Sequence, residues 1–208
     1  MGQVQFRYQR DAAVRYALRH WNDPNPRFAN MDTMGGGGDC TNFTSQCLLA
    51  GGWPLDYRAP GHYTEWWYRR IGDEPFDAHW DDWWSCTWSL PESQFHYLTF
   101  NYGEAIDLKR FPHEVRRVRL GDLLYYDWQG AGRFGHCAIV TGYDRFGRPL
   151  VTYRTLAPRT PVRDGVWHLR FRADARRIFA VLLPDVATYR PTVPDWSELA
   201  PCEAERAR

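Results

Sequence analysis

The sequence is poor in lysine, in long apolar stretches and in excess charge of either sign. Its 26 basic residues include a single lysine, Lys109, and 25 acidic residues balance them. A balanced surface offers no broad positive field to hold nucleic acid or an anionic membrane. No stretch reaches the ~18 apolar residues of a membrane-spanning helix, and the N-terminal segment lacks the apolar core of a signal peptide. We therefore expect no nucleic-acid partner, no membrane span and a cytoplasmic location, or a secreted protein if a leader has been removed.

The sequence also lacks any C-x-x-C pair, which argues against a zinc ribbon. Five cysteines cannot all pair within one chain, so reduced thiols are the simplest interpretation. We expect no metal or cofactor, and we expect Cys47, Cys86 and Cys137 to be small packing residues. Cys202, near the C-terminus, is expected to be exposed and incidental.

Aromatic residues, by contrast, are abundant: the 208 residues include 11 Trp, 12 Tyr and 11 Phe. Such side chains fill hydrophobic cores and also line ligand clefts. The length suits one domain with a substantial core. We expect that domain to span residues 1–184, followed by an irregular, proline-bearing tail over residues 185–208.

Two helices are predicted near the N-terminus. Apolar and aromatic side chains recur at helical spacing over residues 10–21, and the turn-forming NDPNP ends this helix. After four glycines at 35–38, Asp39 is placed to cap a second helix through CTNFTSQCLLA, which Gly51 and Gly52 end. The glycine run provides either slack or room for a substrate to approach the backbone.

Residues 53–101 have no clean periodicity. They combine tryptophans with acidic and turn-forming residues, apart from a short helix predicted after Pro91. A long insert of this kind is typical of a substrate-side elaboration. Trp83, Trp84 and Trp88 either form a satellite core or line the cleft, with Trp88 the first candidate for the cleft.

From residue 118 onward the pattern changes to strands. The segments DLLYYDW, HCAIVTGYD and PLVTYRT are separated by glycine-bearing turns, which predicts an antiparallel meander. VWHLRF and IFAVLL are interpreted as two further strands. Helices followed by strands indicate an α+β fold, with the N-terminal helices packed on an antiparallel β-sheet.

Cys40 directly follows Asp39 and lies in the first turn of the second predicted helix. The partial positive charge and the unpaired N–H groups at a helix start stabilise a thiolate relative to a thiol. The same N–H groups can stabilise the oxyanion of a tetrahedral intermediate. Cys40 is therefore a candidate nucleophile, and burial as a small packing residue is the alternative.

A nucleophilic cysteine needs an imidazole partner, and His136 is the best placed of the seven histidines. It begins the strand HCAIVTGYD, where a side chain is held rigidly near the end of a sheet. The alternative is a structural histidine without a catalytic role. Cys137 follows it and points to the opposite face of the strand, which argues against a joint metal site.

Four segments, GDCTNFTSQCLLAGG, SCTWSLPESQFHYL, LGDLLYYDW and GHCAIVTGYDRFGRPLVTYRT, occur in this order and resemble the putative amidase domain family of the papain-like cysteine peptidase superfamily. The resemblance covers roughly residues 8–156. It implies a papain-like α+β fold, with Cys40 as nucleophile and His136 as general base in hydrolysis of an amide bond through an acyl-enzyme. Asn42 and Trp88 are then supporting or cleft residues.

Two charged residues qualify this interpretation. Asp39 caps the helix, but its charge close to Cys40 opposes formation of the thiolate. Arg154 stands where the family leads us to expect a second histidine; an arginine cannot accept a hydrogen bond and disfavours an imidazolium beside it. Either Arg154 contacts substrate, for example a carboxylate, or another residue orients His136, or catalysis is impaired. Asp127, at the end of the preceding strand, is the candidate orienting residue because hairpin pairing brings it close.

The sequence thus predicts a cysteine amidase or peptidase acting on a peptide or amide substrate, with peptidoglycan stem peptide as the first class to test. Two alternatives stay open. One is a catalytically silent, aromatic-lined module that binds a peptide or glycan. The other is an acyl-transfer, amide-forming enzyme of peptide natural-product biosynthesis. Selective alkylation of Cys40 separates the enzymes from the binding module.

Overall fold

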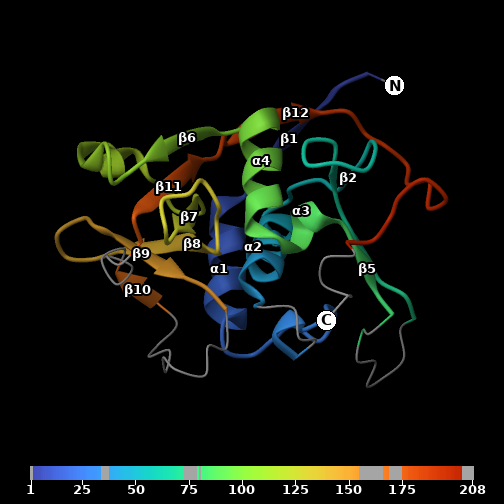
Figure 1. The fold of residues 1–208 in the computed structure, drawn as a ribbon, viewed down its shortest axis with the longest axis horizontal. Coiled ribbons are helices and arrows are strands. Elements are labelled where there is room, and N and C mark those ends of the chain that lie inside the picture. The colour runs from blue at the N-terminus through green and yellow to red at the C-terminus, as the bar shows by residue number, and fades with distance from the viewer. Residues whose placement is uncertain are drawn as a thin grey trace.

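The computed structural model describes residues 2–33, 38–72, 79, 81–154, 166–168 and 175–202. Helices and antiparallel sheets combine in an α+β fold, as predicted (Figure 1). Of the glycines at 35–38, the first three lie outside the described residues. Gly38 has a φ of 138°, a conformation that residues with a side chain rarely adopt, so the chain enters the second helix through a turn that favours glycine.

A six-stranded antiparallel sheet occupies the left of Figure 1, with the strand order β10-β9-β8-β7-β11-β6. Its strands are β6 (Glu104–Asp107), β7 (Leu123–Asp127), β8 (His136–Tyr143), β9 (Pro149–Thr152), β10 (Val166–His168) and β11 (Arg177–Leu182). The predicted meander is confirmed, because β7, β8 and β9 are neighbours in the sheet. The strand predicted from IFAVLL is also present, and as β11 it returns to pair with the other edge of β7.

Three helices pack beside this sheet: α1 (Arg10–His20), α2 (Cys40–Ala50) and α4 (Pro91–Asn101). The bounds of α1 and α2 agree with the predicted helices to within a residue. Proline suits the first position of α4, since the N–H that it lacks has no partner there in any helix. The central helix, α2, is buried continuously from Cys40 to Leu48 and packs against both α1 and β8.

The alternation of side chains along the strands divides the core between the two faces of the sheet. On the face toward the helices lie Tyr125 of β7 and Cys137 of β8. Tyr126 and Ala138, the next residue on each strand, belong to the cluster on the opposite face. The ring of His136 contacts Tyr126, so His136 and Cys137 project to opposite faces, as predicted.

The described part of residues 53–101 contributes to the core, which differs from the expected substrate-side elaboration. It forms helix α3 (Cys86–Ser89), α4 and the paired short strands β2 (Asp56–Tyr57) with β3 (Glu65–Trp66) and β4 (Tyr68–Arg69) with β5 (Trp83–Trp84). Five tryptophans of this segment are at most 4 % exposed: Trp53, Trp66, Trp67, Trp84 and Trp88. Strands of two residues are too short to show a period, so the sequence pattern conceals this part of the core.

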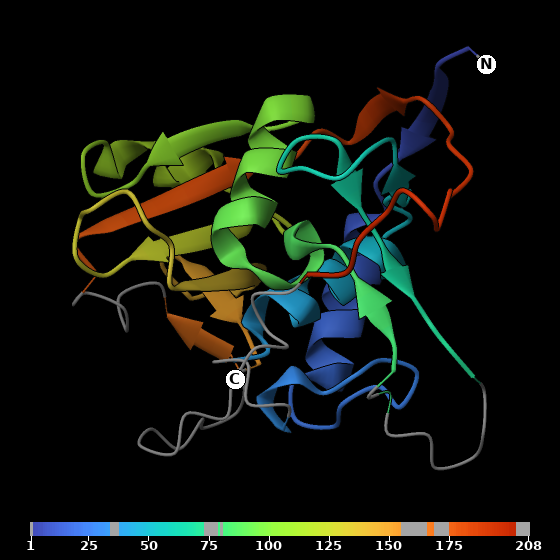
Figure 2. The same ribbon diagram turned by 45° about the vertical axis from the view of Figure 1, so that its right-hand side comes forward.

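The C-terminal segment is tied to the body of the protein, and the prediction of an irregular tail is wrong for its first part. Strand β12 (Val186–Tyr189) pairs with β1 (Val4–Arg7), near the N-terminus. Figure 2 shows the chain then running past the short strands toward α3. The segment that follows β11 is therefore held first by its pairing with β1 and then lies beside α3.

A disulfide between Cys86 and Cys202 corrects the expectation of reduced thiols throughout. Cys202 is 2 % exposed, and its N–H donates to the carbonyl oxygen of Trp84, so it is neither exposed nor incidental. The odd total of five cysteines hid this pair, because three thiols remain free: Cys40, Cys47 and Cys137.

Candidate active site

Cys40 is the first residue of α2, and Asp39 precedes the helix. The N–H groups of a first helical turn have no partner within the helix, so they are available to a negative charge at this end. Cys40 is 7 % exposed, whereas the other two free cysteines, Cys47 and Cys137, are 0 % exposed. Cys40 is thus the free cysteine that keeps some exposed surface.

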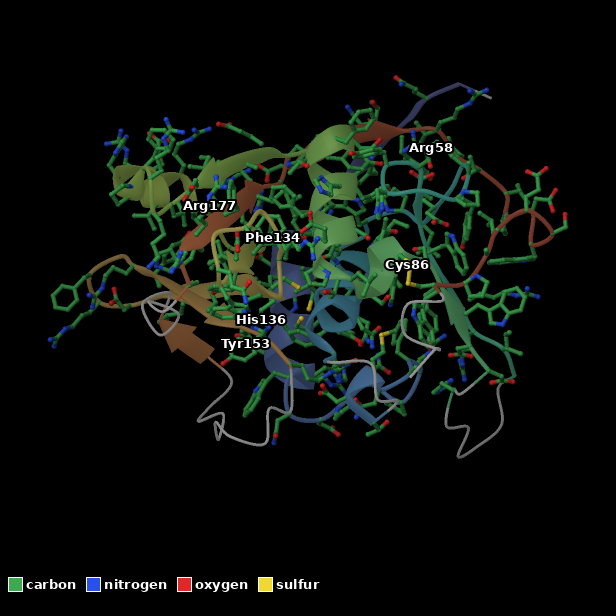
Figure 3. All side chains as sticks on the ribbon, viewed as in Figure 1. Arg58, Cys86, Phe134, His136, Tyr153 and Arg177 are labelled. Atoms are coloured by element: carbon green, nitrogen blue, oxygen red, sulfur yellow. A yellow bond between two sulfur atoms is a disulfide. The ribbon has the colours of Figure 1, made fainter. Side chains whose placement is uncertain are left out.

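His136 is the first residue of β8 and lies opposite Tyr126 of β7 in the sheet. The ring centroid of Tyr153 is 4.6 Å from that of His136, with the rings edge to face, and those of Tyr126 and Trp128 are 5.4 and 6.2 Å away. Figure 3 shows His136 and Tyr153 side by side. The Nε2 atom of His136 is buried and has no hydrogen-bond partner among the described residues. Three aromatic rings thus pack around this imidazole.

The pKa of the Cys40 thiol is lowered well below its usual range. The largest cause is a hydrogen bond from the thiol of Cys137; the charge of His136 and a hydrogen bond from its ring act in the same direction, against the effect of burial. Burial and the neighbouring Cys40 raise the pKa of Cys137 well above its usual range. Of the two thiols, Cys40 is therefore the stronger acid, and Cys137 is the S–H donor to it.

Two threonines of α2 hold these sulfur atoms in position. The Oγ1 atom of Thr41 lies 3.8 Å from Sγ of Cys40 and 3.5 Å from Sγ of Cys137. Thr44 Oγ1 lies 3.4 Å from the same Cys137 sulfur and donates to Oε1 of Gln94 at 3.0 Å. The pair of thiols is thus embedded in a buried polar network.

The Asp39 carboxylate does not cap α2, which corrects its predicted structural role. Its Oδ1 atom accepts hydrogen bonds from the Met31 N–H at 3.0 Å and from Nδ2 of Asn42 at 2.6 Å. Its Oδ2 atom accepts from Nε of Arg154 in a buried ion pair. Burial raises the pKa of Asp39 to about 6, with Arg154 and Asn42 acting against this rise. The negative charge beside Cys40 is therefore compensated.

Arg154 lies two residues beyond the end of β9 and is 5 % exposed. Besides binding Asp39, it donates from Nη1 to the carbonyl oxygen of His20 at 3.2 Å. Its guanidinium is thus engaged with the start of α2 and the end of α1. Arg154, which departs from the family pattern, therefore has a structural role through its ion pair with Asp39.

Asp127 does not serve as the orienting residue of His136, because both of its carboxylate oxygens are engaged elsewhere. They accept the N–H groups of Gly130 and Gly132, at 2.7 Å each, within the turn between β7 and β8. Side chains alternate along a strand, so Asp127 points away from the face on which Tyr126 contacts His136.

Asn42 and Trp88 are both buried, and their contacts support the start of α2. Oδ1 of Asn42 accepts from Nε1 of Trp88 at 2.8 Å, and its Nδ2 donates to the carbonyl oxygen of Ala29 at 2.8 Å as well as to Asp39. Trp88 is 0 % exposed, and its ring centroid lies 5.0 Å from that of Trp66. These contacts fix the approach of the chain to Cys40.

Three residues of the site were not identified from the sequence: Cys137 beside Cys40, and Trp128 and Tyr153 beside His136. The two aromatic residues lie inside the predicted strands DLLYYDW and PLVTYRT, directly after the observed ends of β7 and β9, so the sequence did offer a signal for them. The role of Cys137 depends on how α2 crosses β8, and no local pattern contains that information.

Two further findings bear on the type of site. Among the residues that the structure describes, no group of three or more His, Cys, Asp or Glu side chains is arranged to hold a metal ion. Within the same residues, none of the helices combines the length and the apolar character of a membrane-spanning segment.

The fold and the site define an α+β protein with a thiol at a helix start beside an imidazole at a strand start. A family model described as "Putative amidase domain" matches residues 7–177, and the chain belongs to this family. The chain is similar to the Bacillus subtilis (strain 168) protein described as "Uncharacterized protein YhbB", with 33 % identity over 156 residues, or 74 % of this chain and 43 % of that protein. It therefore spans less than half the length of this relative. No solved structure matches the chain.

Proposed function

We propose that the chain is a cysteine-dependent amidase or peptidase of the papain-like type, with Cys40 as nucleophile and His136 as general acid and base. The observation that carries the proposal is the thiol at the first position of α2, with its pKa lowered by Cys137 and His136. A lowered thiol pKa beside an imidazole is what nucleophilic catalysis by cysteine requires at neutral pH. Membership in the amidase family supports the same reaction class.

In the proposed reaction, the Cys40 thiolate attacks the amide carbonyl carbon and a C–S bond forms. The N–H groups at the start of α2 stabilise the resulting oxyanion. The imidazolium of His136 gives its proton to the leaving nitrogen as the C–N bond breaks. Water then attacks the thioester and loses a proton to His136, and cleavage of the C–S bond restores the thiolate. An amine that replaces water in this step would make the enzyme an acyl transferase.

The proposed substrate is a peptide or another amide, and peptidoglycan stem peptide is the class to test first. The disulfide between Cys86 and Cys202 supports this choice, since disulfides persist in oxidising compartments outside the cytoplasm. The disulfide thereby favours a secreted protein over the cytoplasmic one expected from the sequence.

A silent binding module is less well supported than an enzyme. Its sequence argument was Arg154, which would disfavour a charged imidazole beside it. That guanidinium is paired with Asp39 in a buried ion pair, so its charge is compensated. The feature that suggested lost activity therefore has a structural explanation compatible with catalysis.

The experiment is turnover of a library of peptide amides and stem-peptide fragments by the parent protein and by Cys40→Ala and His136→Ala. We expect activity in the parent and a loss of at least ~10³-fold in each variant. Cys47→Ala, a buried thiol outside the site, is the matched control. Equal turnover by all four proteins would exclude the assigned pair.

A further inference from the structure

Two of the three free thiols lie together in the core, and the proposed reaction uses only one of them as a nucleophile. Cys40 begins α2, Cys137 is the second residue of β8, and both belong to the buried cluster on the face of the sheet toward the helices. Cys40 keeps some exposed surface, whereas Cys137 is fully buried. Such a pair has a second chemistry, because oxidation can join two neighbouring thiols in a disulfide.

Hydrogen bonds connect the two sulfur atoms directly and through a shared hydroxyl. The thiol of Cys137 donates to the sulfur of Cys40. Oγ1 of Thr41 lies 3.8 Å from Sγ of Cys40 and 3.5 Å from Sγ of Cys137, so one oxygen atom contacts both sulfurs. Cys47 lies two helical turns beyond Cys40, or ~10 Å along the helix axis. Of the other two free cysteines, Cys137 is therefore the one within reach of Cys40.

The unequal acidity of the two thiols sets the order in which they react. The hydrogen bond from Cys137, followed by the charge of His136, lowers the pKa of Cys40 well below its usual range, so Cys40 reacts first with an electrophile. Burial raises the pKa of Cys137 well above its usual range, and the hydrogen bond and charge of Cys40 raise it further. The effect of that charge ends once Cys40 is oxidised and neutral, so Cys137 ionises more easily at the second step.

We propose that Cys40 and Cys137 form a peroxide-sensitive thiol pair, in which Cys40 is oxidised and Cys137 converts the product to a reversible disulfide. The Cys40 thiolate attacks hydrogen peroxide, the O–O bond breaks, and Cys40 becomes a sulfenic acid while the leaving hydroxide takes up a proton to form water. The thiol of Cys137 then loses its proton and attacks the sulfenic sulfur. An S–S bond forms and the hydroxyl group leaves as a second water. Two electrons pass from the pair to the peroxide, and a dithiol reductant returns them.

This disulfide blocks the sulfur that attacks the amide in the proposed reaction, so turnover stops until the bond is reduced. It also protects that sulfur, because a sulfenic acid without a neighbouring thiol is oxidised further to a sulfinic acid, which thiols do not reduce. Access of peroxide to Cys40 rests on the proposed function, in which a larger substrate reaches the same atom. The disulfide between Cys86 and Cys202 supports contact with an oxidant, since disulfides persist in oxidising compartments.

The test exposes the full, folded chain to excess hydrogen peroxide at neutral pH. Iodoacetamide then blocks the remaining thiols, and mass spectrometry of a non-reducing digest identifies the state of Cys40. We expect two peptides joined through Cys40 and Cys137, and we expect dithiothreitol to return Cys40 to a form that can be alkylated. Sulfinic acid at Cys40 without the joined peptides would overturn the proposal, and so would a Cys40 that does not react.

Cys137→Ser is the decisive variant, because a serine hydroxyl keeps a donor beside Cys40 but cannot form the disulfide. We expect Cys40 of this variant to proceed to sulfinic acid, so that dithiothreitol restores at least ~5-fold less alkylatable Cys40 than in the parent. Cys47→Ala, which alters the free thiol outside the pair, should form the disulfide as the parent does. Equal recovery of Cys40 in Cys137→Ser and in the parent would contradict the role of Cys137.

Turnover of the peptide library, measured on the same samples, distinguishes the thiol pair from the proposed function. A disulfide that forms in a protein without turnover supports the pair and contradicts the hydrolase. Turnover that peroxide abolishes and dithiothreitol does not restore supports the hydrolase and contradicts the pair. Turnover that returns together with reduction of the bond between Cys40 and Cys137 supports both.

Discussion

Arg154 forms a buried ion pair with Asp39, the residue directly before Cys40, across 115 positions of sequence. The pair fastens the segment after β9 to the start of the helix that carries the candidate nucleophile. It also compensates the negative charge nearest to that thiol. Negative charge near a thiol raises its pKa, so compensation of Asp39 by Arg154 weakens one influence that would oppose ionisation of Cys40.

Breaking this pair should cost much more stability than breaking an exposed one. Arg154→Met leaves Asp39 buried without a counter-charge, and we expect a loss of about 3–5 kcal/mol in the free energy of unfolding at pH 8, measured with urea. Arg117→Met, which breaks the exposed pair with Glu104, should leave the free energy of unfolding nearly unchanged. Similar losses in the two variants would contradict the structural role of the pair.

The raised pKa of Asp39 predicts a specific pH dependence. A carboxylate that binds its proton more tightly in the folded state makes stability fall as pH rises from its unfolded pKa, about 4, through its folded pKa, about 6. We expect this falling contribution in the parent and its absence in Asp39→Asn. The measurement is the free energy of unfolding at pH values from 4 to 7, and parallel profiles for the two proteins would refute the assignment.

Cys137 should tune the acidity of Cys40 through its S–H donor. Cys137→Val removes the donor, so we expect the pH midpoint of Cys40 alkylation to rise by about one unit or more. Cys137→Ser keeps a donor at the same place and should preserve a low midpoint. Cys47→Ala, which alters a buried thiol elsewhere on α2, provides the control, and a midpoint that is equal in all of them would exclude a role for Cys137.

Tyr153 is predicted to be a positioning residue for His136. Its ring lies edge to face with the imidazole, whose Nε2 has no hydrogen-bond partner among the described residues. Tyr153→Leu removes the ring and should reduce alkylation of Cys40 near pH 6.5 several-fold, with a midpoint shifted toward that of a free thiol. Tyr153→Phe keeps the ring and should stay close to the parent. An unchanged pH profile in Tyr153→Leu would contradict this role and show that another group positions the imidazole.

The disulfide between Cys86 and Cys202 closes a loop of more than a hundred residues, since its ends are 116 positions apart. Such a cross-link lowers the conformational entropy of the unfolded chain and is expected to add about 2–5 kcal/mol to the free energy of unfolding. We expect Cys86→Ser with Cys202→Ser to lose that much stability in urea, and added reductant to have no further effect on this variant. A double variant as stable as the oxidised parent would show that the cross-link does not constrain the chain.

The parts of the fold that local patterns determine were predictable. Helices α1 and α2 have a helical period and clear stop signals, and β7, β8 and β9 are long strands with glycine-bearing turns between them. The placement of Cys40 at a helix start and of His136 at a strand start followed from those elements.

What the sequence could not supply are contacts between distant segments. The pairing of β1 with β12, the ion pair of Arg154 and the disulfide of Cys202 each join residues more than a hundred positions apart. The tryptophan-rich core is built on strands of two residues, too short for a period to appear. The prediction for Asp127 was wrong for a similar reason. Hairpin pairing indicated that Asp127 lies near His136, but it did not indicate that N–H groups of the turn bind the Asp127 carboxylate.

The most direct test of the central claim is the rate of Cys40 alkylation by iodoacetamide as a function of pH, followed by mass spectrometry of the labelled peptide. An activated thiol should react with a midpoint well below ~8.5, and His136→Ala should move that midpoint upward by at least about one unit. We expect this shift in a protein that remains folded. A midpoint at or above ~8.5 in the parent, unchanged in His136→Ala, would contradict it.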